Sequence, residues 1–155
     1  MRAFRVALIG HRSVEDYFRV EKELNRVITS LICEKEFVEF RLGRNGEFDI
    51  MAASCIKNVQ HSLDRRNSEM TLVLAYPVAD MEYYAKYYDN VLIPQEIEGL
   101  HFKRAITERN KWLVENCDLF IAYAKNVSGG AGSAVRYAER IGTPIFNLSD
   151  YVDGV

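Results

Sequence analysis

The chain has 155 residues, of which 48% are hydrophobic and 27% are charged, and its formal net charge is −2. This length and composition are typical of one globular domain, and we expect a single domain over residues 1–155. The slightly acidic balance argues against a nucleic-acid partner, which would require a basic surface.

Cys33, Cys55 and Cys117 are far apart and lack the spacing of metal ligands, so we expect free thiols and no metal site. No signal peptide precedes the first apolar run, and no segment reaches the ~18 apolar residues that a membrane span requires. The sequence therefore predicts a reduced, cytoplasmic protein without a membrane partner.

Strands and helices are expected to alternate along the chain. Short apolar runs predict strands at 4–10, 37–43, 70–77, 118–123 and 143–148, and "NVLIP" at 90–94 leaves open a sixth strand. Such alternation predicts an α/β protein with a doubly wound, mainly parallel sheet of five or six strands and helices on both faces.

Helical spacing of apolar residues fills the intervals between these strands. The first helix is expected behind Ser13, which with Asp16 resembles a capping box. Others are expected from about Glu47, over about 102–116 and after the glycines near residue 130. Residues 78–103 are less regular and rich in Tyr, which favours a lid or a subunit contact and leaves open a homodimer.

In such sheets ligands bind at the carboxyl ends of the strands, so the segment after each strand is a candidate site. Gly10, His11 and Arg12 follow the first strand, where a tight turn and a helix start expose N–H groups and Arg12 could hold an anion. A helix cap with a solvated arginine explains these residues equally well.

The turns after the second and third strands carry further polar groups. Gly43, Asn45 and Gly46 indicate a turn with positive φ, and Asp49 follows in the first turn of a helix. Asp49 either complements the helix dipole or accepts hydrogen bonds from a ribose or a base. Tyr76 either stacks on a base or fills the rim of the core.

Two polar residues interrupt the apolar face of the helix over 102–116. Arg109 and Asn110 lie three and four positions after Ile106, on the side that faces the core. Burying them unpaired would cost several kcal/mol, so they either pair within the protein or reach into a ligand cleft.

Small residues separate the strand at 118–123 from the next helix. Glycines let the backbone approach an anion, and a helix N-terminus supplies N–H donors. The sequence therefore predicts a phosphate site here, although it lacks the Gly-Lys-Ser/Thr of a P-loop. The residues concerned are Ser128, Gly129, Gly130, Gly132 and Ser133.

The segments "ERNKWLVENCDLFIAY" and "GGAGSAVRYAERIGTPIFNL" resemble the carboxyl half of the SLOG superfamily of Rossmann-like proteins. This superfamily includes the Lonely-guy nucleotide hydrolases, the DprA proteins and the YpsA-like proteins. "IGHR" and "GRNGEFDIMAA" best fit the YpsA-like and DprA-like branches, the YpsA-like one above all. The resemblance implies a Rossmann-like fold that binds a nucleotide or nucleotide derivative, with phosphate on the glycines of 128–133 and Arg109 beside phosphate and ribose.

Two functions follow from this resemblance. The first is a sensor-like protein that binds a phosphate-containing small molecule, with no cofactor other than such a nucleotide. The second is an N-glycoside hydrolase of nucleotide 5′-monophosphates. The Glu pair that the hydrolases carry is replaced here by Val135 and Arg136. Asp49 or Glu47 would have to act instead, and Asp49 is the catalytic candidate.

A nucleic-acid partner of the DprA kind is disfavoured by the charge. The predicted ligand-binding residues are Gly10, His11, Arg12, Gly43, Asn45, Gly46, Asp49, Tyr76, Arg109, Asn110, Ser128, Gly129, Gly130, Gly132 and Ser133.

Overall fold

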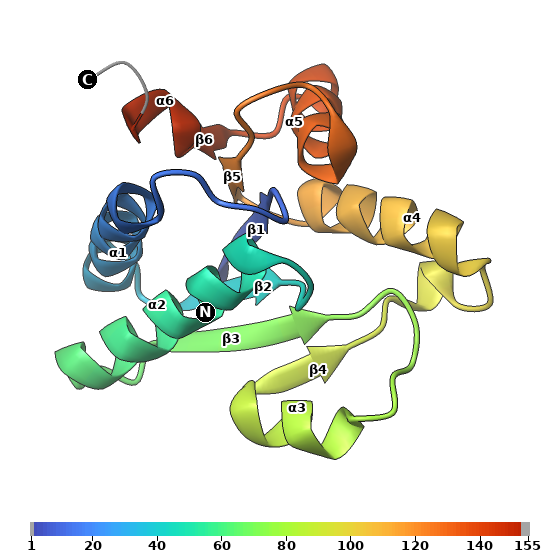
Figure 1. Ribbon diagram of the computed structural model, residues 1–155. Coiled ribbons are helices and arrows are strands. Elements are labelled where there is room, and N and C mark those ends of the chain that lie inside the picture. Colours follow the sequence, from blue (N-terminus) through green and yellow to red (C-terminus); the bar gives the residue numbers. More distant parts are fainter. Residues whose placement is uncertain (1, 153–155) are drawn as a thin grey trace.

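The computed structural model describes residues 2–152 and contains one six-stranded sheet, all of whose strand pairs are parallel (Figure 1). The strand order is β4-β3-β2-β1-β5-β6. This confirms the predicted parallel α/β fold, including its sixth strand. The strands are β1 (Phe4–Gly10), β2 (Val38–Leu42), β3 (Ser68–Val73), β4 (Asn90–Leu92), β5 (Leu119–Tyr123) and β6 (Ile145–Asn147).

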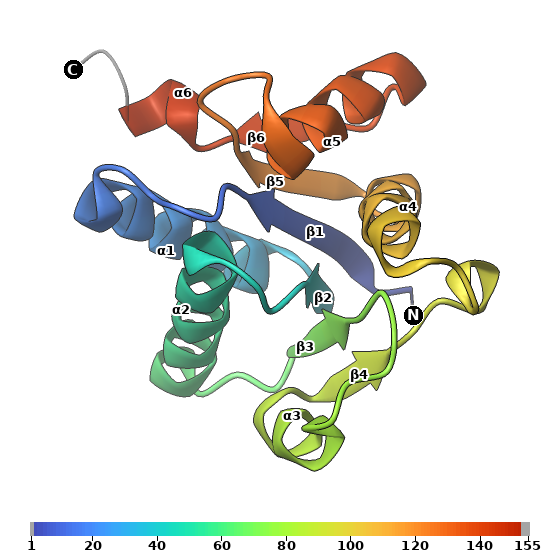
Figure 2. The same cartoon turned by 45° about the vertical axis from the view of Figure 1, so that its right-hand side comes forward.

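Helices cover both faces of the sheet, as Figure 2 shows. One face carries α1 (Tyr17–Glu34) and α2 (Glu47–Leu63), with α6 (Ser149–Val152) beside α1; the other carries α4 (Phe102–Glu115) and α5 (Gly129–Ile141). Residues of β1 alternate between the two cores. Val6 and Leu8 belong to the α1–α2 core, whereas Ala7 and Ile9 belong to the α4–α5 core, because successive side chains of a strand point to opposite faces.

The chain reverses its direction of travel across the sheet next to β1. It runs outward from β1 through β2 and β3 to the edge strand β4, and then returns to place β5 on the other side of β1. The pairing of β1 with β5 extends from Val6 opposite Leu119 to Gly10 opposite Tyr123. A crevice at the carboxyl ends of two such strands is the usual ligand site of this architecture.

Three local features differ from the sequence-based expectation. The Ser13–Asp16 capping box is wrong: Asp16 is itself the N-cap of α1, in a left-handed conformation with φ 53° and without a side-chain cap. Strand β3 ends at Val73, and although Leu74 still donates to the Leu92 carbonyl of β4 at 2.8 Å, the residues from Ala75 to Pro77 lie beyond the strand. The segment 78–103 contains a short helix α3 (Met81–Tyr87), β4 and the 3-10 turn η1 (Gln95–Ile97).

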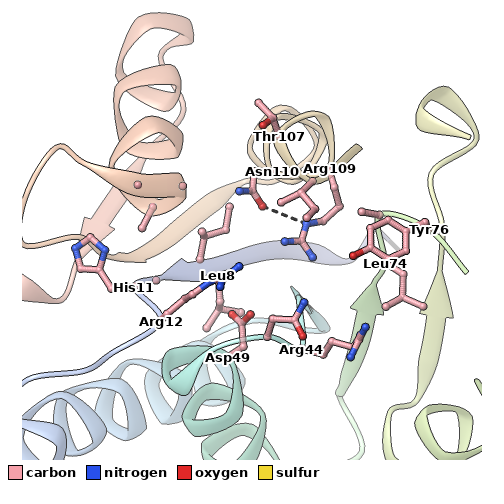
Figure 3. Close-up of a pocket in the computed structure, with 18 of the residues that line it drawn as sticks. Leu8, His11, Arg12, Arg44, Asp49, Leu74, Tyr76, Thr107, Arg109 and Asn110 are labelled. Atoms are coloured by element: carbon pink, nitrogen blue, oxygen red, sulfur yellow. Dashed lines mark hydrogen bonds between the residues drawn. The ribbon is translucent and has the colours of Figure 1, made fainter. Parts of the chain in front are cut away.

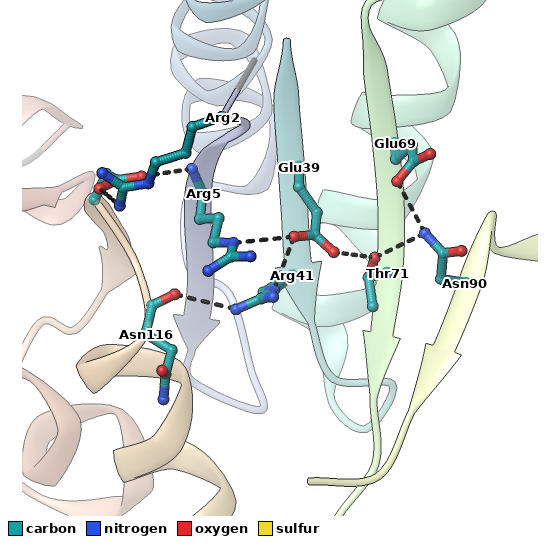
Figure 4. A network of polar contacts seen from close by, with 9 residues as sticks. Arg2, Arg5, Glu39, Arg41, Glu69, Thr71, Asn90 and Asn116 are labelled. Carbon is teal, nitrogen blue, oxygen red and sulfur yellow. Dashed lines mark hydrogen bonds and ion pairs between the residues drawn. The ribbon is translucent and has the colours of Figure 1, made fainter.

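A polar network lies on the α4 face of the sheet, away from the carboxyl ends of the strands (Figure 4). Glu39 of β2 accepts a hydrogen bond from Thr71 at 2.8 Å and forms ion pairs with Arg41 at 3.1 Å and Arg5 at 3.6 Å. Arg41 also donates to the carbonyl of Asn116, just after α4, at 3.1 Å. The network thereby anchors the end of α4 to the central strands and fixes the helix that carries Arg109.

Among residues 2–152, no helix is both long enough and apolar enough to cross a membrane. The three cysteines are free thiols, with Cys33 exposed and Cys55 buried.

Candidate functional site

A cavity of about 420 Å³ opens at the carboxyl ends of the strands (Figure 3). Its volume falls within the range of about 300–1,000 Å³ that is usual for small-molecule sites. Its walls come from the end of β1, the start of α2, the segment after β3, the middle of α4 and the first turn of α5. These five segments are remote in sequence, and the parallel sheet brings them to one edge.

The cavity gathers most of the residues that the sequence singled out. They come from all five walls, and they include Arg109 and Asn110, the two polar residues on the apolar face of α4. The predicted residues that line the cavity are Gly10, His11, Arg12, Asn45, Asp49, Tyr76, Arg109, Asn110, Gly129 and Gly130.

Gly43 and Gly46 do not line the cavity but shape the turn beneath it. A Cβ on Gly43 would lie 2.7 Å from Nη1 of Arg109 and 3.1 Å from Oδ2 of Asp49, so a larger residue there would displace the Arg109 guanidinium. Gly46 has φ 93° and is the N-cap of α2. There the Glu47 N–H donates to the Arg12 carbonyl at 2.8 Å, which joins the β1 and β2 turns.

The glycine-rich segment is the first turn of α5 and not a loop. Ser128 is the N-cap, its hydroxyl bonds to the side chain of Asn126, and Ser133 accepts a hydrogen bond from Arg136. Neither serine lines the cavity. A Cβ on Gly132 would lie 2.4 Å from the Val127 carbonyl, so this glycine lets the preceding segment fold over the helix start.

Only the beginning of this turn therefore faces the cavity. Gly129, Gly130 and Ala131 line it, and they belong to the N-terminus of a 13-residue helix. Such a terminus presents unpaired backbone N–H groups and a partial positive charge. A Cβ on Gly130 would lie 3.4 Å from Nδ2 of Asn110, which places the amide of Asn110 beside the helix start.

Arg109 is fixed from two sides. Its Nη1 donates to the carbonyl of Val73, the last residue of β3, and its Nε donates to Oδ1 of Asn110, both at 3.1 Å. The sequence left open whether Arg109 pairs within the protein or reaches into a ligand cleft. In the structure it does both, because it forms these two bonds and also lines the cavity. Neither bond uses Nη2. Burial lowers the pKa of Arg109, and the nearby Asp49 carboxylate partly offsets this.

Asp49 is buried, with an exposed fraction of 9%, although its carboxylate lines the cavity. Burial raises its pKa from 3.8 to about 7, and attraction to Arg109 and a hydrogen bond from the backbone of Asn45 limit the rise. A carboxyl group with such a pKa exchanges its proton near neutral pH, which is suited to ligand-coupled proton transfer.

His11 connects the β1 and β5 turns. Its Nε2 accepts a hydrogen bond from the Lys125 backbone N–H at 2.9 Å, and its ring meets Tyr123 edge-on at 5.6 Å between centroids. Burial lowers the pKa of His11, with Glu15 acting in the opposite direction. The accepting Nε2 places the proton of the neutral ring on Nδ1.

Arg44 is the main residue that the sequence analysis missed. It lines the cavity, and its Nη1 donates to the hydroxyl of Tyr84 in α3 at 3.2 Å, with the guanidinium 5.4 Å from the centre of the ring. Its position between Gly43 and Asn45, in the turn after the second strand, could have identified it as a candidate from the sequence. The other lining residues that were missed are Leu8, Ile9, Leu74, Ala75, Val78, Ile106, Thr107 and Ala131.

The charges of the cavity are unequal. Within the described part of the chain, Arg12, Arg44 and Arg109 line it, against a single carboxylate from Asp49. Glu47 does not line it, and the Glu47 side chain accepts a hydrogen bond from the Val14 N–H at 2.6 Å. The cavity therefore attracts anions, and Asp49 is the one lining carboxylate that could act as an acid or a base.

Comparison with known proteins identifies the fold. No model of a known protein family and no curated protein sequence matches the chain. Solved structures do match. DNA processing protein A (DprA) from Streptococcus pneumoniae superposes with a TM-score of 0.68 at 19% identity, over 96% of this chain and 54% of that one.

Two further structures are similar. DprA from Helicobacter pylori, described with a single-stranded DNA binding mode, has a TM-score of 0.65 at 14% identity, over 96% of this chain and 71% of its own. The molybdenum cofactor binding protein from Rippkaea orientalis has a TM-score of 0.61 at 18% identity, over 94% and 76%.

The chain has a Rossmann-like α/β fold that it shares with these DprA and molybdenum cofactor binding structures. This confirms the resemblance at the level of the fold. The assignment to the YpsA-like branch stays a prediction. The chain spans only about half of the S. pneumoniae protein, 54% of its length.

Proposed function

We propose that this protein binds a nucleotide or nucleotide derivative in the strand-end cavity and acts as a sensor-like binding protein. The observation that carries the proposal is Arg109, which Val73 and Asn110 hold in place while its guanidinium lines the cavity. A fixed guanidinium can bind a phosphate through two N–H groups without losing much side-chain entropy.

The start of α5 supports a phosphate at the other side of the cavity. Gly129 and Gly130 have no side chains that would keep an anion from the backbone N–H groups, and Asn110 lies beside them. A helix N-terminus of this kind is a common phosphate site. Together with Arg12 and Arg44, it gives the cavity the positive potential that a phosphate requires.

The segment after β3 supports a place for a planar ring. Leu74, Ala75, Tyr76 and Val78 line the cavity there, on the side of β3. Apolar and aromatic side chains of this kind favour the faces of a base, whereas the opposite wall is polar. This division between an apolar end and an anion-binding end fits a nucleotide better than inorganic phosphate.

The structural neighbours widen the range of ligands to be tested. They include proteins described as binding molybdenum cofactor and single-stranded DNA. The net charge of −2 favours a small ligand over DNA. A molybdenum cofactor and a short DNA strand nevertheless belong in the panel.

Ligand-observed NMR with nucleotide monophosphates, cyclic nucleotides, ADP-ribose, molybdenum cofactor and a short oligodeoxynucleotide tests the proposal. We expect line broadening with at least one nucleotide. Arg109→Ala is expected to weaken it about 10- to 100-fold, because hydrogen bonds to a charged group are lost. Arg104→Ala, an exposed position on the same helix, is the matched control.

Four outcomes decide between the candidate functions. Binding that is lost in Arg109→Ala and kept in Arg104→Ala supports the proposal. Steady appearance of free base would show the N-glycoside hydrolase, with Asp49 as the first residue to replace. Failure of every nucleotide to bind would overturn the proposal, and binding of the oligonucleotide alone would favour a DNA partner.

A further inference from the structure

A gap separates the guanidinium of Arg109 from the carboxylate of Asp49, next to Gly43. A Cβ on Gly43 would lie 2.7 Å from Arg109 Nη1 and 3.1 Å from Asp49 Oδ2, so these atoms are no farther apart than the sum of the two distances. Even so, the two groups form no ion pair, for which a nitrogen and an oxygen must come within 4.0 Å. They attract each other across the cavity without touching (Figure 3).

The width of this gap fits one oxygen atom. Hydrogen bonds that involve charged groups are about 2.8 Å long, so an oxygen bonded to both sides holds its partners roughly 4.5 to 5.6 Å apart, depending on the angle at the oxygen. Arg109 Nη1 and Asp49 Oδ2 are more than 4.0 Å and at most 5.8 Å apart, a range that contains these separations.

The chemistry of the two sides selects a hydroxyl group. An ionised carboxylate only accepts hydrogen bonds, and a guanidinium only donates them. A carbonyl or phosphate oxygen would accept from Arg109 but could not donate to Asp49, whereas an amide N–H would donate to Asp49 but could not accept from Arg109. A hydroxyl oxygen donates to one side and accepts from the other. Arg109 Nη1 carries two hydrogens, and only one is used by the Val73 carbonyl.

We propose that the gap between Asp49 and Arg109 is a hydroxyl subsite, in which a sugar hydroxyl of the bound ligand donates to Asp49 Oδ2 and accepts from Arg109 Nη1. The inference rests on the proposed function, because the hydroxyl belongs to the same phosphate-bearing ligand. It makes the protein selective for ribose over deoxyribose at one position of the sugar.

The groups around Asp49 make this selectivity depend on pH. Arg109 faces it from α4, the backbone N–H of Asn45 bonds to it, and Tyr88 lies close enough for the two charges to interact. Arg12, Arg44 and His11 line the same cavity. Since the pKa of Asp49 is about 7, the carboxylate is available to accept from a hydroxyl above this pH. Below pH 7 the protonated carboxyl group of Asp49 donates a hydrogen bond, so an oxygen that only accepts can occupy the gap instead of a hydroxyl.

The experiment compares ribose ligands with their deoxy counterparts by isothermal titration calorimetry at pH 6 and pH 8. The probes are ribose 5-phosphate and each nucleotide 5′-monophosphate that binds, each with its 2-deoxy or 3-deoxy counterpart. At pH 8 we expect removal of one of the two hydroxyls to weaken binding at least about 10-fold, because two hydrogen bonds to charged groups are lost. At pH 6 the loss is expected to be smaller.

Asp49→Asn tests the role of the carboxylate, since it keeps the shape of the side chain. We expect the preference for the hydroxyl to fall to about threefold and to lose its dependence on pH, because hydrogen bonds to neutral groups are weaker. Asp64→Asn, the same replacement at the exposed far end of α2, is expected to change neither property.

The two proposals fail in different ways. Equal binding of the ribose and deoxy ligands at pH 8 would overturn the hydroxyl subsite, leave the proposed function standing and assign the gap to water. A preference that survives unchanged in Asp49→Asn would also overturn the subsite. Failure of ribose 5-phosphate and of every nucleotide in the NMR panel to bind would overturn both proposals.

Discussion

Replacing Asp49 by Asn removes a buried carboxyl group and keeps its size. The pKa of Asp49 rises from 3.8 to about 7 on folding because burial disfavours the charge. Between these two values the folded protein binds more protons than the unfolded chain, so this group's contribution to stability falls as the pH rises through that window and levels off above pH 7. From pH 5 to pH 8 the expected loss is about 2.5 kcal/mol.

Urea unfolding at constant ionic strength measures this effect. The free energies of unfolding of the wild type, Asp49→Asn and Asp64→Asn are compared at pH 5, 6, 7 and 8. The difference between Asp49→Asn and the wild type should increase in favour of the variant by about 2.5 kcal/mol across this range. The attraction to Arg109 is already contained in the pKa of Asp49, and any effect of the replacement that does not depend on pH cancels in this comparison. Asp64→Asn is the matched control, because it makes the same replacement at an exposed position.

Two results would refute the reasoning. A flat difference for Asp49→Asn would show that burial does not disfavour the charge at this position. A difference of the opposite slope would show that Arg109 holds the Asp49 pKa below its ordinary value. That result would mean a direct ion pair, and it would also close the gap on which the hydroxyl subsite depends.

Two further predictions follow from the turns around the cavity. Gly132→Ala should lower the free energy of unfolding by about 2–4 kcal/mol, since its Cβ would lie 2.4 Å from the Val127 carbonyl. Gly130→Ala should lower it by less than about 1 kcal/mol, because its Cβ would meet only the Asn110 side chain at 3.4 Å. Thermal unfolding measures both variants, and equal effects would contradict this prediction. Because burial lowers the pKa of His11 from 6.5, stability from this group is complete above pH 6.5 and declines as the pH falls below it. His11→Gln should remove that decline, and an unchanged acid limb of the unfolding profile would show that burial does not lower the pKa of His11.

The fold was largely predictable because its signals are local. Runs of apolar residues such as 4–10 and 118–123 mark buried strands whatever the rest of the chain does. The strand-end rule then placed Gly10, Asp49 and Tyr76 at one edge without any knowledge of the strand order. The interruption of an apolar stripe by Arg109 and Asn110 was also visible, because a helix repeats every 3.6 residues.

The start of α5 was harder to predict. Glycine disfavours helix by about 1 kcal/mol per residue relative to alanine, so Gly129, Gly130 and Gly132 favour a loop in isolation. The helix nevertheless includes all three, because Ala131, Ala134 and Ala138 bury against the sheet. Tertiary packing outweighs local propensity here, and it turns Ser128 and Ser133 away from the cavity.

The sequence by itself determined the order of strands and helices, the parallel class of the sheet and the edge at which polar residues collect, because periodicity and turn residues act over a few positions. Only the tertiary structure decided which of these residues meet. The gap between Arg109 and Asp49 lies between side chains of α4 and α2, and the Arg44–Tyr84 contact connects the turn after β2 to α3. Such distances depend on how two remote segments pack against the same strands, and a difference of 1 or 2 Å separates an ion pair from a ligand site.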